Sequence, residues 1–243
     1  MNLKVIIKRT LIRCGLDIRI FTPSRSDAAR LKAVFDTLAI NLVIDVGANS
    51  GQYANYLRSI GYQKRILCFE PLTSAYASLK NFALKDRLIE VAPQMALGDT
   101  DSEISINVAR NSESSSILPM LAAHLDAAPQ SDYVDTETVP IRRLDSVFAD
   151  LVNPGQAVFL KIDAQGYEKK ILQGAMMTLS KIKGIQLEMS LVELYKGEPL
   201  YREMIDLLES FGYELYDLSP TFANKLTGRV YQVDGIFVQN NIN

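Results

Sequence analysis

The sequence lacks tryptophan and contains one histidine and two cysteines. Cys14 and Cys68 are too few for a disulfide framework, so a reducing compartment is expected. No apolar run approaches the roughly 20 residues of a membrane-spanning helix, and the N-terminus lacks the uninterrupted apolar core of a signal peptide. The formal net charge is −2, with the basic residues spread along the chain, which argues against a nucleic-acid-binding surface. We therefore expect a cytoplasmic protein that does not bind nucleic acid.

The chain has 243 residues, of which 48% are hydrophobic and 22% charged, and this suits one globular domain of ordinary size. We expect that domain to span 26–243, after an extension over 1–25. Residues 1–20 hold five basic side chains against one acid, with an apolar stripe at helical spacing. Such a basic amphipathic helix either docks on the domain or on a second subunit of a homodimer, or makes peripheral contact with an anionic membrane at its inner face.

The most informative segment is 42–51, which reads Leu-Val-Ile-Asp-Val-Gly-Ala-Asn-Ser-Gly. Its apolar, mostly β-branched start predicts a buried strand, and helical spacing follows over 52–60. A strand, a tight turn and a helix form the place where an open α/β sheet binds a nucleotide-like ligand. Gly47 and Gly51 let the backbone approach such a ligand closely, and Asn49 lies between them. Asp45 disfavours a phosphate and favours an ammonium group, so we expect the site to bind S-adenosylmethionine.

The segment 65–71 predicts a second buried strand that ends in an acid. Glu70 would face the first turn, where its carboxylate can accept both ribose hydroxyls of the cofactor. Pro71 favours the start of the next helix and lies beside that contact. Ala96 and Leu97 follow a third strand over 88–91, and we expect them to form the turn beneath the adenine.

The segment 158–168 repeats the order of strand, acid, turn and helix, and we expect this helix to span 167–180. Asp-x-Gly-Ala-Asn-x-Gly at 45–51, Phe-Glu-Pro at 69–71 and Leu-Lys-Ile-Asp-x-Gln-Gly-x-Glu at 160–168 together resemble the FkbM family of methyltransferases. The resemblance covers roughly residues 40–240, with the motifs in matching order. The first motif alone is shared with many methyltransferases and some dehydrogenases, whereas the three together are specific.

The resemblance implies an α/β fold: one Rossmann-like class I methyltransferase domain with helices on both faces of a seven-stranded, mostly parallel sheet and an antiparallel edge pair. It also implies S-adenosylmethionine as the cofactor and O-methylation of a hydroxyl on a sugar, glycan, polyketide or similar metabolite. The alternatives are N- or carboxyl-methylation of a small molecule, or a non-catalytic ligand-binding protein on this fold. An NAD-dependent oxidoreductase is disfavoured, because Asn49 interrupts the glycine pattern that it needs.

Three side chains are candidates for the base that removes the proton of an alcohol acceptor. Asp163 ends a central strand beside the first one, although it could instead cap a turn. Glu188 ends the next strand, where it could also be part of a structural ion pair. His124 has a suitable pKa but could be a packing residue. Lys161 leaves the same face as Asp163 and needs a partner when buried, which we expect to be Glu188.

The segment around 100–141 is predicted to be an insertion. Alternating residues over 103–108 and 136–141 predict an antiparallel hairpin, and the polar stretch 110–133 between them is long enough to cover a site. We expect this stretch to act as a lid in which Ser115, Ser116 and His124 contact the acceptor, together with Lys161. A magnesium ion between Asp163 and Glu188 would need a third oxygen that no ligand spacing supplies, so no metal is expected.

Overall fold

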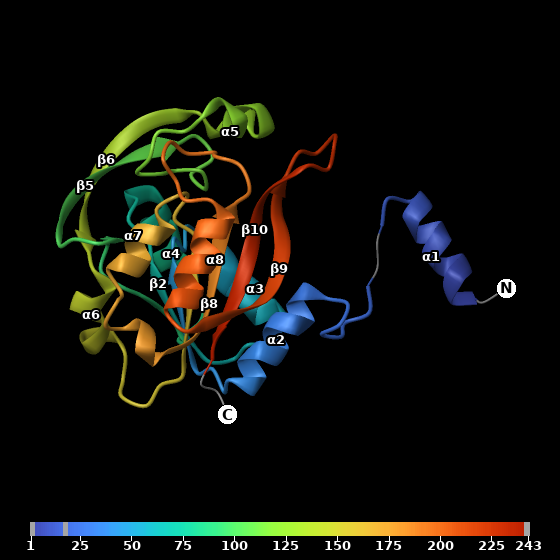
Figure 1. Ribbon diagram of the computed structural model, residues 1–243, viewed down its shortest axis with the longest axis horizontal. Helices are drawn as coiled ribbons and strands as arrows, with labels where there is room; N and C mark the ends of the chain where they lie inside the picture. The colour runs from blue at the N-terminus through green and yellow to red at the C-terminus, as the bar shows by residue number, and fades with distance from the viewer. Residues whose placement is uncertain (1–2, 17–18, 241–243) are drawn as a thin grey trace. The chain divides into compact units, whose positions relative to one another are not determined.

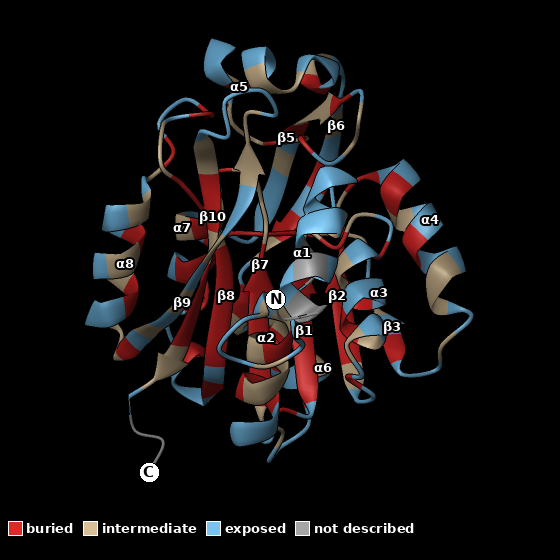
Figure 2. Ribbon diagram, turned by 90° about the vertical axis from the view of Figure 1, so that its right-hand side faces the viewer, coloured by how far each residue is buried: buried red, intermediate tan, exposed pale blue. Residues whose placement is uncertain are grey.

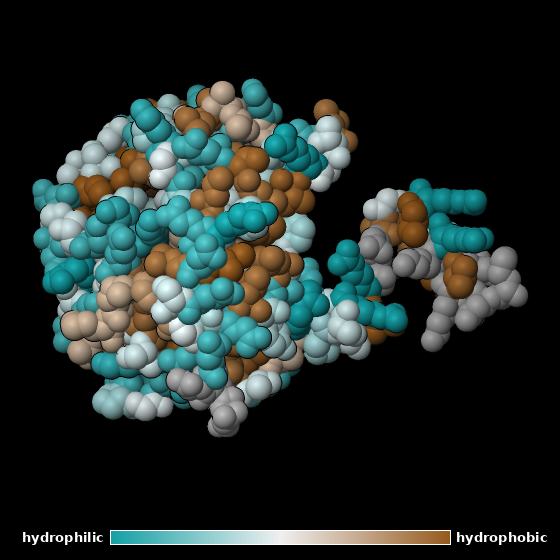
Figure 3. Space-filling view, in the orientation of Figure 1, coloured by the Kyte–Doolittle hydropathy of each residue, from teal (hydrophilic) through white to brown (hydrophobic). Residues whose placement is uncertain are grey.

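The computed structural model describes residues 3–16 and 19–240 and divides the chain into two compact units, one up to Thr37 and one from Leu38. The first unit holds helices α1 (Leu3–Arg13) and α2 (Asp27–Thr37). Apolar side chains of α1 lie at the surface, with Ile7 50% and Ile12 55% exposed, and Arg9 and Arg13 of the same helix are exposed too. Figure 3 shows hydrophobic and hydrophilic side chains together on the described part of this helix. Asp17 and Ile18 of the predicted extension lie outside the described residues.

The second unit is built on a seven-stranded sheet with the order β3-β2-β1-β7-β8-β10-β9 (Figure 1). The first five strands of this order are parallel, and β10 pairs antiparallel with both of its neighbours. The predicted seven-stranded sheet with an antiparallel edge pair is therefore confirmed. The strands are β1 (Leu42–Val46), β2 (Arg65–Phe69), β3 (Ile89–Val91), β7 (Val158–Ile162), β8 (Ile182–Ser190), β9 (Tyr213–Ala223) and β10 (Val230–Gln239).

Helices cover both faces of this sheet. They are α3 (Gln52–Ser59), α4 (Thr73–Ala83), α6 (Leu144–Leu151), α7 (Glu168–Gln173) and α8 (Tyr201–Ser210). The continuous helix expected over 167–180 is wrong, because α7 ends at Gln173 and only a short 3-10 turn, η2 (Leu179–Lys181), follows. Helix α6 was not predicted, although Leu144, Val147, Phe148 and Leu151 have the spacing of an apolar helical face.

The two faces of the sheet differ in character, because side chains alternate along each strand. Ile44, Leu160 and Leu187 belong to a large apolar core that also includes residues of α6, α7 and α8. The intervening residues point to the opposite face, and near the carboxyl ends of the strands many of them are polar. Figure 2 shows how completely the central strands are buried. Polar groups on such strands must be satisfied within the protein.

A second sheet of three strands carries the predicted insertion. Strand β5 (Ser102–Ala109) pairs antiparallel with β6 (Tyr133–Arg142), and β6 pairs parallel with β4 (Ala96–Leu97). The antiparallel hairpin is confirmed, whereas Ala96 and Leu97 form a buried strand rather than the expected turn. Residues 110–133, which run from the end of β5 to the first residue of β6, are called the insertion below. It contains α5 (Ala122–Ala127) and the 3-10 turn η1 (Pro129–Ser131).

Candidate active site

The first part of the site is the glycine turn, residues 47–51, between β1 and α3. Gly47 has φ +80°, and a Cβ there would lie 1.9 Å from the carbonyl oxygen of Asp163. Gly51 has φ +98°, and a Cβ there would lie 2.5 Å from the Phe82 ring. Both positions therefore require glycine, by backbone conformation and by space. The turn consequently lies directly against the end of β7.

Glu70 holds the glycine turn through its carboxylate. Its Oε2 accepts a hydrogen bond from the backbone N–H of Asn49 at 2.8 Å, and its Oε1 accepts one from Leu72 at 2.9 Å. The residue is 5% exposed, and burial raises the pKa of its carboxyl to about 7 in spite of these two donors. Each oxygen keeps a further lone pair, so a role for Glu70 toward ribose hydroxyls stays a prediction.

Asp45 is the acid of the first motif, and it is deeply buried. It is 1% exposed, and its Oδ2 has no hydrogen-bond partner among the described residues. Burial raises the pKa of this carboxyl to about 7, while the nearby Lys161 ammonium opposes the shift and Asp163 adds to it. A buried acceptor without a partner is costly, so Asp45 points to a ligand that donates to it.

Lys161 and Asp163 form the charged pair at the end of β7. The Lys161 Nζ lies 3.1 Å from Asp163 Oδ2, and the side chains are 5% and 36% exposed respectively. Burial alone would lower the pKa of Lys161, but the surrounding carboxylates, led by Asp163, hold it above its ordinary value. The expected pairing of Lys161 with Glu188 is therefore wrong: the strand register places Lys161 opposite Gln186, two residues before Glu188 on β8.

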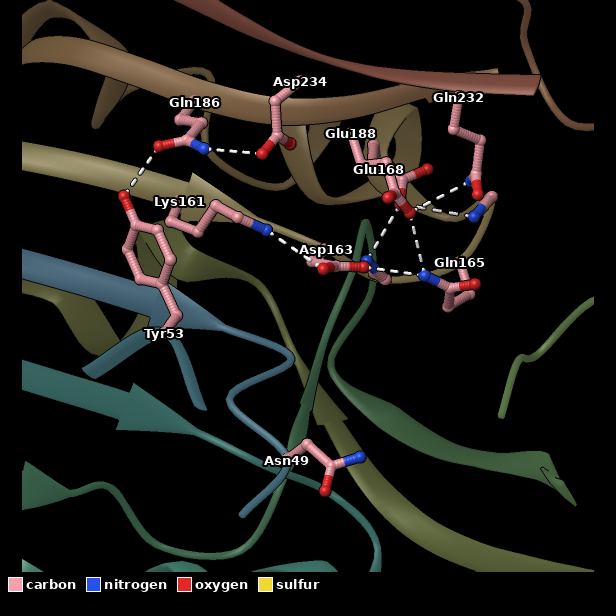
Figure 4. A network of polar contacts seen from close by, with 12 residues as sticks. Asn49, Tyr53, Lys161, Asp163, Gln165, Glu168, Gln186, Glu188, Gln232 and Asp234 are labelled. Carbon is pink, nitrogen blue, oxygen red and sulfur yellow. Dashed lines mark hydrogen bonds and ion pairs between the residues drawn. The ribbon is translucent and has the colours of Figure 1, made fainter. Parts of the chain in front are cut away.

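Glu188 is held by two amides rather than by the lysine. Its Oε2 accepts hydrogen bonds from Gln165 Nε2 at 2.9 Å and from Gln232 Nε2 at 3.0 Å. The Gln165 Nε2 also donates to Asp163 Oδ1 at 2.8 Å (Figure 4). Burial, with Asp163 nearby, raises the pKa of Glu188 well above its ordinary value. The expected cluster of Lys161, Asp163 and Glu188 is present, with Gln165 as the link between the acids.

The same face carries polar residues that sequence reasoning missed. Gln186 accepts from the Tyr53 hydroxyl at 2.7 Å and donates to Asp234 at 2.7 Å. Tyr53 belongs to α3, and its ring lies 5.5 Å from the Lys161 ammonium. We call the sheet residues of this face the polar row, namely Asp45, Lys161, Asp163, Gln186, Glu188 and Asp234. Polar residues inside otherwise apolar strands were the only sequence signal for Gln186 and Asp234.

His124 lies in the insertion and is 3% exposed. Its Nε2 lies 3.1 Å from the Tyr195 hydroxyl, and its ring packs between Tyr195 and Phe222, with centroid distances of 5.2 and 5.4 Å. Its Nδ1 has no partner among the described residues. Burial lowers the pKa of the imidazole. This is the placement of a packing residue, although the Tyr195 hydroxyl connects it to Gln165.

The serines expected to contact the acceptor have partners within the chain. The Ser115 hydroxyl accepts from the Ala109 backbone N–H at 2.9 Å. The Ser116 hydroxyl donates to the carbonyl of Gln165 at 2.7 Å. These bonds shape the insertion and join it to the turn after β7, so a contact with acceptor stays a prediction for both residues.

The insertion also contacts the glycine turn. Asn49 Nδ2 donates to the Ser112 hydroxyl at 3.1 Å, and Gln52 Nε2 donates to Glu113 at 3.0 Å. Pro71 lies next to Glu70, and its carbonyl accepts from Gln94 at 2.7 Å. The insertion, the glycine turn and the end of β7 therefore surround one region of the molecule.

The residues that the structure describes contain neither a metal-binding cluster nor a membrane-spanning helix. No group of three or more His, Cys, Asp or Glu side chains within 3–16 and 19–240 is arranged to hold a metal ion. No helix in those ranges combines the length and apolar composition needed to cross a bilayer.

Comparison with known proteins agrees with the motifs. The family model described as a methyltransferase FkbM domain matches residues 45–215, which is more than half of the chain. The chain belongs to the FkbM methyltransferase family. This confirms the resemblance carried by the three motifs and assigns the chain to the methyltransferases. A curated relative in Sinorhizobium fredii, the 2-O-methyltransferase NoeI, is 29% identical over 175 residues, which cover 70% of this chain and 72% of the relative.

Solved structures with this architecture include other methyltransferases. The FkbM methyltransferase of Methylobacillus flagellatus aligns with a TM-score of 0.46 at 17% identity, over 81% of this chain and 43% of that chain. The 243-residue chain therefore covers less than half of the Methylobacillus flagellatus protein. The magnesium protoporphyrin IX methyltransferase of Synechocystis, solved with bound S-adenosylmethionine, aligns with a TM-score of 0.45 at 9% identity, over 98% of both chains.

Proposed function

We propose that this chain transfers the methyl group of S-adenosylmethionine to a hydroxyl of a sugar, glycan, polyketide or similar metabolite. Membership of the FkbM family supports the methyl transfer, and the curated relative that is 29% identical is named a 2-O-methyltransferase. The observation that carries the proposal is the position of Asp163. Its carboxylate is 36% exposed and ion-paired to a buried lysine, and its backbone lies against Gly47 of the glycine turn.

The residues of the first two motifs fit the cofactor. The unpartnered Oδ2 of Asp45 suits the ammonium of the methionine part, directly or through water. Gly47 and Gly51 let the turn pack against the Asp163 carbonyl and the Phe82 ring, where a Cβ would clash. The Glu70 carboxylate, which holds this turn, keeps lone pairs that suit ribose hydroxyls. When bound, S-adenosylmethionine supplies an activated methyl group on its sulfonium. The chain's own task is then to align a hydroxyl oxygen and exclude water.

The acid cluster supports an alcohol as the acceptor. Asp163 can accept the proton that an alcohol loses, and the ion pair with Lys161 fixes one of its oxygens, Oδ2. Burial and the neighbouring Asp163 raise the pKa of both Glu188 and Asp234 on the same face, so a second ionised carboxylate is disfavoured there. A carboxylate acceptor would be repelled there, so this surrounding favours O-methylation of an uncharged hydroxyl over carboxyl methylation.

The test compares Asp163→Asn with His124→Gln in the purified chain, with S-adenosylmethionine and a panel of uncharged methyl glycosides. If Asp163 accepts the proton, Asp163→Asn lowers the rate of demethylated-donor formation by about a hundred-fold, the size expected of a lost general base. The affinity for S-adenosylhomocysteine, measured by calorimetry, should change little. His124→Gln should keep most of the rate, because its imidazole is buried.

Two results would contradict the proposal. Full activity of Asp163→Asn would remove that residue from the reaction. Tight binding of S-adenosylhomocysteine without transfer to any hydroxyl compound, but with transfer to amines or carboxylates, would move the protein to another class of methyltransferase.

A further inference from the structure

Both polar atoms of the Gln165 side chain, and its backbone carbonyl, make hydrogen bonds within the candidate active site. Its Nε2 donates to Asp163 and Glu188 at 2.8 and 2.9 Å, and its Oε1 accepts from the Tyr195 hydroxyl at 2.6 Å. Its backbone carbonyl accepts from Ser116 at 2.7 Å. An amide nitrogen has two hydrogens, so the two carboxylates take both of them.

The backbone at Gln165 has an uncommon conformation. Its φ is +51°, and Gly166 follows with φ +95°. A non-glycine residue in the left-handed region is sparsely populated, and such residues cluster at functional sites when the surroundings enforce them. Here Glu168 enforces the turn, because its Oε1 accepts from the backbone N–H groups of Ala164 and Gly166 at 2.9 and 3.2 Å. The turn therefore aims the Gln165 amide between the two acids.

The two acids decide which way this amide faces, because a hydroxyl such as that of Tyr195 can either donate or accept. If the amide of Gln165 were turned over, its oxygen would face the carboxylates of Asp163 and Glu188, and two hydrogen bonds would be replaced by two repulsions. With the nitrogen toward the acids, the amide oxygen accepts from the Tyr195 hydroxyl at 2.6 Å, and the hydroxyl oxygen then accepts from His124 Nε2–H at 3.1 Å. The hydroxyl therefore holds the amide in the orientation that the acids select.

Tyr195 is in turn held by the insertion. It is fully buried, and the backbone around it pairs with the insertion through Leu121 N–H to the Leu194 carbonyl and Lys196 N–H to the Pro119 carbonyl, both at 2.8 Å. The insertion is thus connected to the acid pair by an uninterrupted series of hydrogen bonds that runs through Tyr195 and Gln165.

We propose that Gln165 is a positioning residue: its amide, held at its oxygen by the Tyr195 hydroxyl, fixes the directions in which Asp163 and Glu188 present their carboxylates to the acceptor. The inference rests on the proposed function, in which Asp163 accepts the proton of the acceptor. It adds that the insertion, which contacts both Tyr195 and the Gln165 carbonyl, helps to arrange the acid pair.

The test uses the titration of Glu188, which needs no acceptor. The charged groups that face Glu188 are Lys161 and Asp163 from the end of β7, Glu168 from α7 and Asp234 from β10. The carboxyl carbon is followed by ¹³C-detected nuclear magnetic resonance against pH, with S-adenosylhomocysteine present, and its signal is assigned by its loss in Glu188→Gln.

A hydrogen bond donated to a carboxylate favours the ionised form and lowers its pKa. Gln165→Met keeps the length of the side chain and removes both donors, so the pKa of Glu188 should rise by about one unit. Tyr195→Phe removes only the hydroxyl that holds the amide oxygen and should raise the same pKa by a smaller amount. Tyr213→Phe is the matched control, because its buried hydroxyl lies 2.7 and 2.9 Å from the carbonyl oxygens of Leu179 and Ile182 and makes no contact with Gln165 or Glu188, and it should leave the pKa unchanged.

An unchanged Glu188 titration in folded Gln165→Met or Tyr195→Phe would overturn the inference, as would an equal shift in Tyr213→Phe. Circular dichroism checks folding, and if Gln165→Met does not fold, Tyr195→Phe decides alone. The proposed function fails separately: a chain that shows the predicted shifts and methylates no hydroxyl compound keeps the positioning role and loses the reaction assigned to it.

Discussion

Replacing Asp45 by asparagine separates two effects of its carboxylate. One is the loss of stability caused by burying a charge, and the other is the contribution of that charge to cofactor binding. Asp45 is 1% exposed, and its Oδ2 has no hydrogen-bond partner among the described residues. Desolvation is the main cause that raises the pKa of its carboxyl from 3.8 to about 7. In the unfolded chain the carboxyl ionises first, so the folded chain loses stability as the pH rises from about 4 to about 7.

The size of this loss follows from the shift. A difference of about three pKa units corresponds to about 4 kcal/mol once both states are ionised, and about 2–3 kcal/mol of it accrues between pH 5 and pH 8. Asp45→Asn cannot ionise, so its stability lacks this contribution at either pH. The buried amide hydrogens cost about 1–3 kcal/mol at both pH values, and that cost cancels in the comparison. Glu168, whose carboxyl also has a pKa of about 7, is common to both proteins and cancels likewise. The pKa of Glu70 is raised mainly by burial and only in smaller part by the Asp45 charge, so its contribution cancels for the most part.

The assay is urea unfolding, followed by circular dichroism at pH 5 and pH 8, in the absence of ligand. Relative to Asp45→Asn, the wild-type chain should lose about 2–3 kcal/mol of unfolding free energy between the two pH values. Asp36→Asn is the control, because the Asp36 side chain is 68% exposed, and it should follow the wild type. At pH 8 Asp45→Asn should bind S-adenosylhomocysteine about ten-fold to a hundred-fold more weakly. A stability difference between wild type and Asp45→Asn that is the same at both pH values would refute the reasoning.

Three further predictions concern other parts of the chain. Glu70→Ala should weaken S-adenosylhomocysteine binding by about ten-fold to a hundred-fold in calorimetry, since it removes both the proposed ribose contact and the bond that holds the glycine turn; an unchanged affinity would reject a role for Glu70 in cofactor binding. Replacing 111–131 by a short Gly-Ser loop, with the Arg110–Asp132 ion pair kept as its base, should spare that affinity and abolish methyl transfer, and surviving transfer would show that the insertion is not needed. The exposed apolar and basic side chains of α1 favour an anionic surface. The full chain should therefore float with phosphatidylglycerol vesicles and deletion of 1–20 should abolish this flotation, whereas neither chain should float with phosphatidylcholine vesicles. Equal flotation of both chains would assign the contact elsewhere.

The fold was predictable where local pattern and burial agree. Strands β1 and β2 begin at the predicted residues, because buried parallel strands are short apolar runs bounded by turn residues. Ala96 and Leu97 were not predictable as a strand, since their partners Ile141 and Arg142 lie more than 40 positions along the chain, on the second strand of the hairpin. Local sequence carries no signal for such pairing.

The site was predictable in its acids and not in its amides. An acid at the end of a buried strand is conspicuous in the sequence, as Asp163 shows. Gln165 and Gln232 are ordinary polar residues until the strand register and the turn after β7 bring them to Glu188. The choice of Asp163 over Glu188 as the partner of Lys161 likewise depends on register, which the hydrophobic pattern of two-sided buried strands leaves open.

The polar row is assembled from segments that are far apart in the chain, and this bears on the order of folding. Asp45 is contributed early in the sequence and Asp234 near its end, on a strand that must pair with β8 before Gln232 reaches Glu188. Contacts over such separations form late, because closing a long loop costs entropy. A nascent chain can therefore complete the glycine turn and its bond to Glu70 while β10 is still being synthesised. Affinity for the cofactor and the ability to use it should then arise at different times in the life of one molecule.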